Sequence, residues 1–235
     1  MTPDTKLKIQ LFLVVALLVA GVRTAIIFYE RSAPAKTSQA PPLNPDYYVV
    51  PKKLYAYDLK SARQLTEQPV WVKEGYRYSY YPYRNGHADF SHEAGLLLPL
   101  EKLAVKDVVT DVTPGSRDER QILAVFEQGG QTYAFPIGSI KQDNPRIYSD
   151  EILYIQDPHE LYKHWPPEVW QAIDQHQVKP GMSELQVDFS IGLGLLEGTG
   201  DSDVRTLNYP NGGKPLRITF RNGKAAEIQP GSNQG

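Results

Sequence analysis

The sequence predicts an α+β protein that begins with a single transmembrane helix. Three observations carry this prediction: an apolar run near the N-terminus, short alternating segments rich in Tyr, Val and Ile after residue 47, and a helical apolar stripe after residue 166. The predicted parts are a transmembrane anchor (1–30), a Pro-rich linker (31–46), a β-rich domain (47–156), an α+β domain (157–230) and a tail (231–235).

Composition excludes several classes of protein. The 235 residues are 41% hydrophobic and 22% charged, with a formal net charge of −2, which is an ordinary globular balance. The chain has no run of basic residues of the kind that would predict a nucleic-acid partner. Because the chain has no cysteine, it has no disulfide, no thiol nucleophile, no thiolate metal site and no lipid anchor on cysteine.

The first predicted element is the apolar run Ile9–Tyr29, whose one charge is Arg23. About 20 apolar residues span a bilayer, and Arg23 lies close enough to the end of the run to reach the headgroups. Lys6 and Lys8 precede the run, so the N-terminus is expected in the cytoplasm, with the rest on the periplasmic side of the inner membrane. A cleaved signal peptide, with Ile9–Gly21 as its apolar region, is the alternative, but the only A-x-A match, Ala33–Ala35, contains a proline and lies more than ten residues past Gly21.

The linker, "RSAPAKTSQAPPLNP", has no apolar period and is typical of a semi-extended spacer. The β-rich domain follows, with strand-like segments at 47–59, 68–86, 103–112, 121–140 and 150–155. Within 121–140, Gly129–Gly130 joins two alternating runs, which is a hairpin signal. Several short strands separated by turns predict a small barrel or sandwich.

From Asp157 the pattern becomes helical. Pro166 and Pro167 favour a helix start, an apolar stripe follows through Trp170, and Lys179–Gly181 is expected to end the helix.

A second helix is predicted because Ser183 and Gln186 have capping-box spacing, with Met182 and Val187 at the hydrophobic-staple positions. Strict alternation from Leu185 favours a strand over the same residues. Both assignments of 183–191 remain open.

The stretch "SIGLGLLEGTGDSD" (190–203) contains four glycines in a pattern close to a nucleotide-binding loop. Such a loop needs a strand before it and a helix N-terminus after it to hold the phosphates. Here strand signals follow, and no Gly-Lys-(Ser/Thr) is present. We therefore predict a helix C-cap at Gly192 and a loop, without a nucleotide or other cofactor.

Three strands are predicted after this loop, around 204–209, 216–220 and 225–228. A Pro-Asn-Gly-Gly turn joins the first two. Asn222–Gly223 joins the last two, which is the strongest short hairpin signal.

The segment 165–228 resembles the SmpA/OmlA (BamE-like) family. The matching residues are Gly181, Met182 and Ser183 at the start of a short helix, Gly192 at its end, and Asn222, Gly223 and Lys224 in the closing hairpin. The resemblance implies two helices on a three-stranded antiparallel sheet, in an envelope protein that works by protein–protein contact, as in outer-membrane protein assembly. This chain departs from the assembly-type members in lacking their lipidated cysteine and in carrying a preceding β-rich domain.

The candidate binding residues form a tyrosine-rich strip in "YRYSYYPYRNG". Tyr and Arg are enriched at interface hot spots, so the strip is a candidate surface for a peptide or a cell-wall sugar. Cross-strand packing over a β core is the alternative. The residues are Tyr76, Arg77, Tyr78, Tyr80, Tyr81 and Tyr83.

No metal site is predicted. His159 and His164 stand five residues apart, whereas the zinc-protease helix motif has its two histidines four residues apart. Asp201 and Asp203 lack the further oxygen ligands of a calcium loop.

The expected function is that of a non-enzymatic, membrane-anchored scaffold or assembly factor with envelope proteins as partners. A cell-wall or small-ligand binding module that uses the tyrosine strip is the alternative, and an envelope hydrolase is the third possibility. A hydrolase would need clustered carboxylates or histidines in a cleft.

Overall fold

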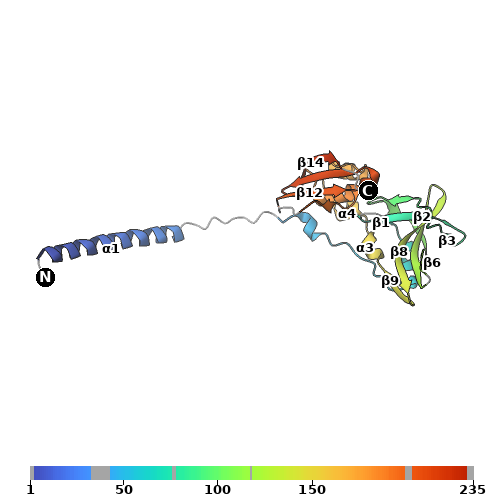
Figure 1. Cartoon of the computed structure of the whole chain (residues 1–235), viewed down its shortest axis with the longest axis horizontal. Coiled ribbons are helices and arrows are strands. Elements are labelled where there is room, and N and C mark those ends of the chain that lie inside the picture. The colour runs from blue at the N-terminus through green and yellow to red at the C-terminus, as the bar shows by residue number, and fades with distance from the viewer. Residues whose placement is uncertain (1–2, 33–42, 76–77, 117, 199–202, 232–235) are drawn as a thin grey trace. The chain divides into compact units, whose positions relative to one another are not determined.

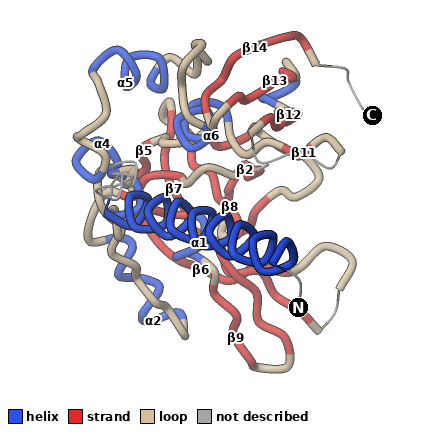
Figure 2. The backbone as a smooth tube through the Cα atoms, turned by 90° about the vertical axis from the view of Figure 1, so that its left-hand side faces the viewer, coloured by secondary structure: helices blue, strands red, loops and turns tan. Residues whose placement is uncertain are grey.

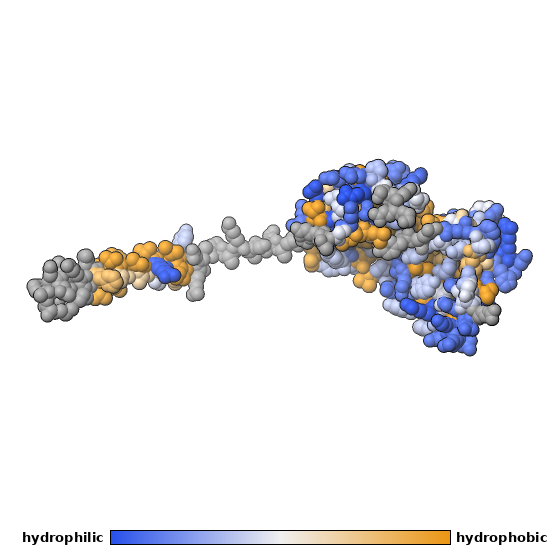
Figure 3. Space-filling view, viewed as in Figure 1, coloured by the Kyte–Doolittle hydropathy of each residue, from blue (hydrophilic) through white to orange (hydrophobic). Residues whose placement is uncertain are grey.

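The chain divides into two compact units, residues 1–47 and 48–235. The computed structural model describes residues 3–32, 43–75, 78–116, 118–198 and 203–231. The first unit contains helix α1 (Pro3–Ser32), the dark blue helix of Figure 1. Its segment Phe12–Tyr29 has a mean hydropathy of 2.3 and is 0% buried, and Figure 3 shows its apolar surface in orange. The segment is long and apolar enough to cross a membrane, and a signal sequence has the same properties.

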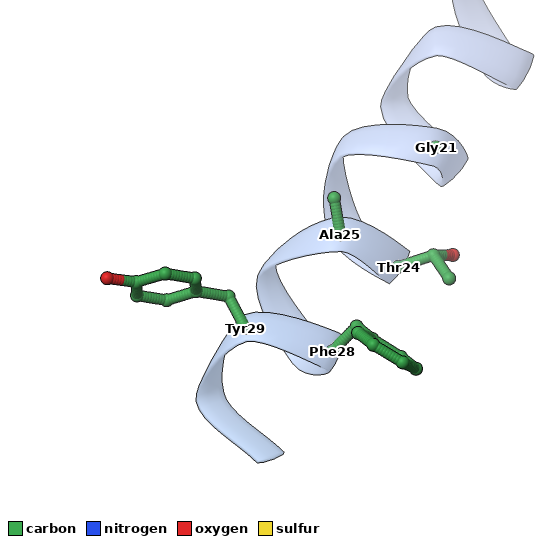
Figure 4. Close-up of a pocket in the computed structure, with 5 residues that line it drawn as sticks. All are labelled: Gly21, Thr24, Ala25, Phe28 and Tyr29. Carbon is green, nitrogen blue, oxygen red and sulfur yellow. The ribbon is translucent and has the colours of Figure 1, made fainter. Parts of the chain in front are cut away.

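One face of α1 is narrow because small residues gather there. Figure 4 shows Gly21, Thr24 and Ala25 along this face, with the rings of Phe28 and Tyr29 at its end. The Thr24 hydroxyl donates to the Ala20 carbonyl at 2.8 Å, so it has a partner inside an otherwise apolar segment. The residues labelled in Figure 4 line an open groove on the surface of α1.

The predicted class, mixed α+β, is confirmed. In the second unit the largest sheet is antiparallel and curls into a half-barrel of order β3-β2-β8-β7-β6, with β4 beside β2 and β9 beside β8 (Figure 2). Its strands are β2 (Tyr78–Arg84), β3 (His87–Ala88), β4 (Gly95–Leu97), β6 (Val105–Val112), β7 (Glu119–Gln128), β8 (Gln131–Lys141) and β9 (Asn144–Ile147).

Two further antiparallel sheets complete the second unit. One has the order β10-β1-β5 and the other β11-β12-β13-β14. Their strands are β1 (Val70–Val72), β5 (Lys102–Leu103), β10 (Leu153–Tyr154), β11 (Leu195–Leu196), β12 (Val204–Tyr209), β13 (Leu216–Arg221) and β14 (Lys224–Pro230). The short helix η1 (Pro45–Tyr48) spans the boundary between the two units. The helices of the second unit are α2 (Leu59–Ala62), η2 (Arg63–Thr66), α3 (Ser149–Ile152), α4 (Pro158–Leu161), α5 (Pro167–Asp174), α6 (Glu184–Ile191) and η3 (Asn211–Gly213).

Local turn chemistry accounts for the hairpins. Gly129–Gly130 joins β7 to β8, and Asn222–Gly223 joins β13 to β14, as predicted. All four residues have positive φ, which the two-residue hairpin turns of the I′ type require. The same turn, Asn85–Gly86, joins β2 to β3.

Several predicted boundaries differ from the structure. Segment 47–59 contains no strand, because Pro51 has no N–H to donate and no neighbouring strand pairs with it. Segment 150–155 is mostly the end of α3, followed by the two-residue β10. Helix α5 ends at Asp174, before the predicted Lys179–Gly181, and His176 just beyond it has a φ of 51°. The last sheet has a short fourth strand, β11, in addition to the three predicted.

Two large apolar cores hold the second unit together. The C-terminal core combines α5, α6 and the β12–β14 sheet with Trp71 of β1 and Tyr154 of β10. The sheet core lies under one face of the half-barrel and includes Phe126, Phe135 and Leu65. The predicted boundary at 156/157 therefore falls inside one compact unit, because residues before it complete the C-terminal core.

Helix α6 explains why its sequence was ambiguous. The capping box of Ser183 and Gln186 is present, so 183–191 is a helix. Every residue from Gln186 to Ile191 is buried, because α5, the β12–β14 sheet and β10 surround it. A helix that is enclosed on all sides has no solvent-exposed face on which polar residues must gather. The positions of its polar residues in the sequence therefore do not reveal the helical period.

Candidate functional site

The tyrosine strip is divided between two faces of β2. Tyr78 and Tyr80 are half-buried and pack on the sheet core. The Tyr80 ring meets Phe126 and Tyr133 edge-on, at 5.6 and 5.1 Å between centroids. Burial raises the pKa of both tyrosines. Tyr76 and Arg77 lie outside the described residues.

Tyr81 and Tyr83 lie on the opposite face of β2, because strand residues alternate. The Tyr81 ring contacts Phe90 at 5.1 Å, and Tyr83 packs against a small core formed by Leu123, Val125 and Ala134. The four described tyrosines are thus all half-buried, and both faces contribute to packing. The strip as a binding surface stays a prediction.

The glycine run begins at a junction between distant parts of the second unit. Gly192 ends α6 with a φ of 88°, and its N–H donates to the Asp188 carbonyl at 2.9 Å. A Cβ at Gly192 would lie 2.6 Å from the Gly75 carbonyl oxygen. The next residue, Leu193, donates its N–H to that same oxygen at 3.3 Å. Gly192 therefore allows the end of α6 to meet the segment that follows β1.

Gly194 allows a second close approach. A Cβ there would lie 2.6 Å from the Tyr209 ring, and Tyr209 of β12 is fully buried. Gly192 is the helix C-cap, as predicted, but the predicted loop contains the short strand β11, and residues 199–202 lie outside the described residues. Both Gly192 and Gly194 are needed because other groups press against them.

Two carboxylates lie beside this junction. Asp188 is 8% exposed, and burial, with smaller contributions from Glu184 and Glu74, raises its pKa to about 7. Its Oδ1 has no hydrogen-bond partner among the described residues, and neither has the Tyr209 hydroxyl. The Tyr209 hydroxyl and the Gly194 N–H act to lower the pKa of Asp188, but burial outweighs them, and the hydroxyl lies outside hydrogen-bonding geometry.

Glu74 is the second carboxylate. The Tyr154 hydroxyl donates to Glu74 Oε2 at 3.1 Å, and burial raises the pKa of Glu74. Burial, followed by the nearby Glu74 charge, raises the pKa of Tyr154 as well. Lys73 donates to the Asp150 carbonyl at 2.7 Å and covers the Tyr154 ring at 4.9 Å, and burial lowers the pKa of Lys73.

Most of the titratable side chains in this arrangement are buried, and burial favours their neutral forms. Asp188, Tyr154 and Tyr209 are buried within the C-terminal core, whereas a hydrolytic site needs its carboxylates in a cleft. Sequence reasoning missed this pair because Glu74 and Asp188 are far apart in the chain and neither belongs to a motif. The only signal in the neighbouring sequence was one acidic residue, Asp188, within a largely apolar helix.

A third buried carboxylate, Asp111, joins the two end strands of the half-barrel. Asp111 is on β6, and it accepts hydrogen bonds from the Ala88 N–H of β3 at 2.6 Å and from His87 Nδ1 at 3.0 Å. It also accepts from the Val112 N–H at 2.7 Å. Burial acts to raise the pKa of Asp111, but these hydrogen bonds outweigh it and the pKa lies below its ordinary value.

We expect Asp111→Ala to lower the free energy of unfolding by about 2–3 kcal/mol, because it removes a buried carboxylate that accepts three hydrogen bonds. The lowered pKa of Asp111 means that this stabilisation is present above pH 4 and is lost as the pH falls through the folded-state pKa. Urea unfolding with amide exchange of Ala88 measures both effects. Asp118→Ala, which removes an exposed carboxylate just before β7, serves as control and should leave the midpoint nearly unchanged; equal losses would contradict the assignment.

Two histidines of the C-terminal part, His159 and His176, have hydrogen-bond partners. His159 stacks on Trp170 at 4.1 Å, and its two ring nitrogens face Asp157 and Asp174 at 3.1 and 3.0 Å. A shallow hollow of about 610 Å³ lies beside them. His176 donates from Nδ1 to the Ser190 carbonyl at 2.8 Å. In the described part of the chain, no three His, Asp or Glu side chains converge in a way that fits a metal ion. Asp203 is described at the start of β12, whereas Asp201 lies outside the described residues.

The first residues of the predicted C-terminal motif, Gly181 to Ser183, lie against the start of strand β14. The Ala225 N–H donates to the Met182 carbonyl and the Gly181 N–H to the Ala225 carbonyl, both at 2.8 Å. Ser183 bridges to Lys224 in the closing hairpin. The start of α6 therefore covers the beginning of edge strand β14.

The other edge of that sheet, β11, is exposed. Leu195 pairs with Asn208 and Leu196 with Leu207 of β12, and both leucine side chains are about half exposed, at 52% and 49%. The Glu197 N–H extends the ladder to the Thr206 carbonyl at 2.9 Å. In the described part of the chain, no strand pairs with the outer side of β11.

Comparisons of the chain with protein-family models, curated proteins and solved structures give no match. The resemblance of 165–228 to the SmpA/OmlA family therefore stays a prediction, and the site must be judged on its geometry alone.

Proposed function

We propose that this protein is a membrane-anchored, non-enzymatic envelope protein that acts through protein–protein contacts. Helix α1 supports the anchor, because Phe12–Tyr29 is apolar, of spanning length and without any contact that buries it. On this proposal the N-terminus lies in the cytoplasm and the second unit in the periplasm, in keeping with the lysines that precede the apolar run.

The exposed edge strand β11 is the single observation that carries the proposed contact. Successive strand residues point to opposite faces of a sheet, so Leu195 and Leu196 present apolar side chains on both faces. Proteins usually protect an open edge by keeping the strand short or with Lys, Pro or a bulge, and β11 is short, at two residues, but has none of the other three. An edge that instead carries two exposed leucines suits the addition of another strand.

The proposed occupant is an extended apolar segment of another envelope protein. A strand edge offers backbone N–H and C=O groups in a row, and only an extended chain complements them along its length. One ion pair lies beside the edge: Arg217 Nε is 2.7 Å from Glu197 Oε2. The resemblance of 165–228 to a family of envelope assembly proteins agrees with this kind of partner.

We expect a photo-crosslinking residue at Leu195, in the full-length chain in cells, to form an adduct with an envelope protein. The matched control is the same residue at Val112, an exposed apolar position on β6, which should give no adduct. Leu196→Lys should abolish the Leu195 adduct without changing the unfolding midpoint, because lysine blocks an edge but disturbs no core.

Three results would contradict the proposed contact: no adduct from Leu195, equal adducts from both positions, or an adduct that survives Leu196→Lys. An adduct with a second copy of the chain would replace the envelope partner by self-association. Turnover of a substrate by the purified protein would overturn the non-enzymatic assignment.

The tyrosine strip offers less support for cell-wall binding. Tyr78 and Tyr80 pack on the sheet core, so replacing them with alanine would disturb folding as well as any sugar contact.

A further inference from the structure

A segment at the start of the second unit carries an exposed apolar row that the fold does not use. We call residues 48–57 the strap; it begins at Tyr48, the last residue of η1, ends before α2, and has no strand or α-helix. Four large side chains of the strap are 63% to 84% exposed. They are Tyr48, Val50, Tyr55 and Tyr57.

The strap is held in place by its other residues. Val49 packs against the C-terminal core, and Leu54 and Ala56 pack against the sheet core. The Lys52 N–H donates to Gln156 Oε1 at 2.7 Å, and Lys53 lies 3.9 Å from Asp150. The outward row is therefore presented by a segment that is packed on both large cores.

This concentration of exposed apolar side chains is local. Outside α1, the described residues have eleven exposed large hydrophobic side chains, and four of them lie within the ten residues of the strap. Scattered exposed apolar residues are normal on a protein surface, whereas several on one short segment are a candidate contact with another surface.

We propose that the strap contacts the surface of the same bilayer that holds α1, with its tyrosines at the headgroup level and its lysines toward anionic lipid. This inference rests on the proposed membrane anchor. Tyrosine is enriched at membrane interfaces because its ring is apolar and its hydroxyl is polar. Lys52 and Lys53 lie within the row, and each basic residue near an anionic surface contributes favourably.

The length of the connection favours this surface over a protein partner. Helix α1 ends at Ser32 and the strap begins at Tyr48, so the connecting chain spans at most about 55 Å when fully extended. A second contact by an already tethered chain is effectively intramolecular, at an effective concentration on the order of mM for a short linker. Weak interfacial contacts are therefore enough to bring the strap to the bilayer.

The absence of cysteine makes a clean labelling experiment possible. In the full-length chain reconstituted into lipid nanodiscs, Tyr55→Cys and Val112→Cys are each labelled with an environment-sensitive fluorophore. These positions are matched in exposure, at 63% and 62%. A nitroxide on the lipid headgroup should quench the label at position 55 at least threefold more than the label at 112, and more strongly with anionic lipid.

A second variant tests the charge. K52Q, which leaves the Lys53–Asp150 contact in place, should reduce the extra quenching seen with anionic lipid while leaving the unfolding midpoint within a few degrees. Equal quenching at positions 55 and 112 would overturn the inference. So would protection of position 55 that appears only when another protein is added, since that result identifies a protein surface.

A separate experiment tests the proposed membrane anchor, on which the strap contact depends. Alkaline extraction of membranes from cells that make the unlabelled chain retains a spanning protein in the pellet. If the chain is released at its mature, shortened length, the anchor is wrong; if it is retained but position 55 is not quenched, the anchor stands and the strap contact is wrong.

Discussion

Asp188→Asn is expected to stabilise the protein at pH 8 by up to about 4 kcal/mol. The wild-type carboxylate is buried, with one oxygen unpaired, and its pKa rises from 3.8 to about 7 in the folded state. Above pH 7 the folded protein must therefore hold an unfavourable buried charge. Asparagine keeps the shape and an acceptor oxygen but carries no charge.

The direction of the pH dependence follows from the raised pKa. Below pH 4 Asp188 is protonated in both states and contributes nothing. Between pH 4 and 7 the unfolded chain releases the proton while the folded protein keeps it, so the wild type loses stability as the pH rises. Above pH 7 the loss is complete. Glu74 contributes in the same direction because its pKa is raised too.

Urea unfolding at pH 4 and pH 8 measures this effect. The stability gain of Asp188→Asn should be large at pH 8 and small at pH 4. Asp118→Asn, at an exposed position, controls for the loss of one negative charge and should change neither value. A destabilised Asp188→Asn protein at pH 8 would show that the carboxylate has a favourable partner.

Gly192→Ala is expected to destabilise the protein by about 3–5 kcal/mol. The backbone there has a φ of 88°, and the new Cβ would lie 2.6 Å from the Gly75 carbonyl oxygen. A carbonyl oxygen is backbone and cannot turn aside as a side chain does. The end of α6 and the segment after β1 must therefore move apart, and Leu193 loses its hydrogen bond to Gly75.

Gly198→Ala separates the two causes. Gly198 also has a positive φ, of 70°, but a Cβ there meets no atom within 4 Å. It should cost about 1 kcal/mol, the usual penalty for a side chain in this conformation. Thermal unfolding of the two variants compares them directly; similar losses would mean that the contact with Gly75 carries no energy.

The sequence predicted the features that depend on neighbouring residues. The hairpins at Gly129–Gly130 and Asn222–Gly223 and the cap formed by Ser183 and Gln186 follow from rules that operate within a few positions. Each of these residues acts on its own backbone, so no knowledge of the fold is needed.

The missed features depend on residues that are distant in sequence. Asp111 meets Ala88 only because the sheet curls, and Gly192 meets Gly75 only after the C-terminal core has formed. The burial of α6 on every side likewise removed the polar face that would have revealed its period. The carboxylate pair of Glu74 and Asp188 has no local signature for the same reason.

The cover of α6 also determines how the chain must be made. Trp71 and Tyr154 pack in the C-terminal core with α6 and the β12–β14 sheet, yet they are synthesised before those elements. Until the last third of the chain arrives, both aromatic side chains lack their cover, and an incomplete chain with exposed apolar surface is prone to aggregate. The interval between emergence of Tyr154 and completion of β14 is therefore the period in which a nascent chain most needs protection by chaperones.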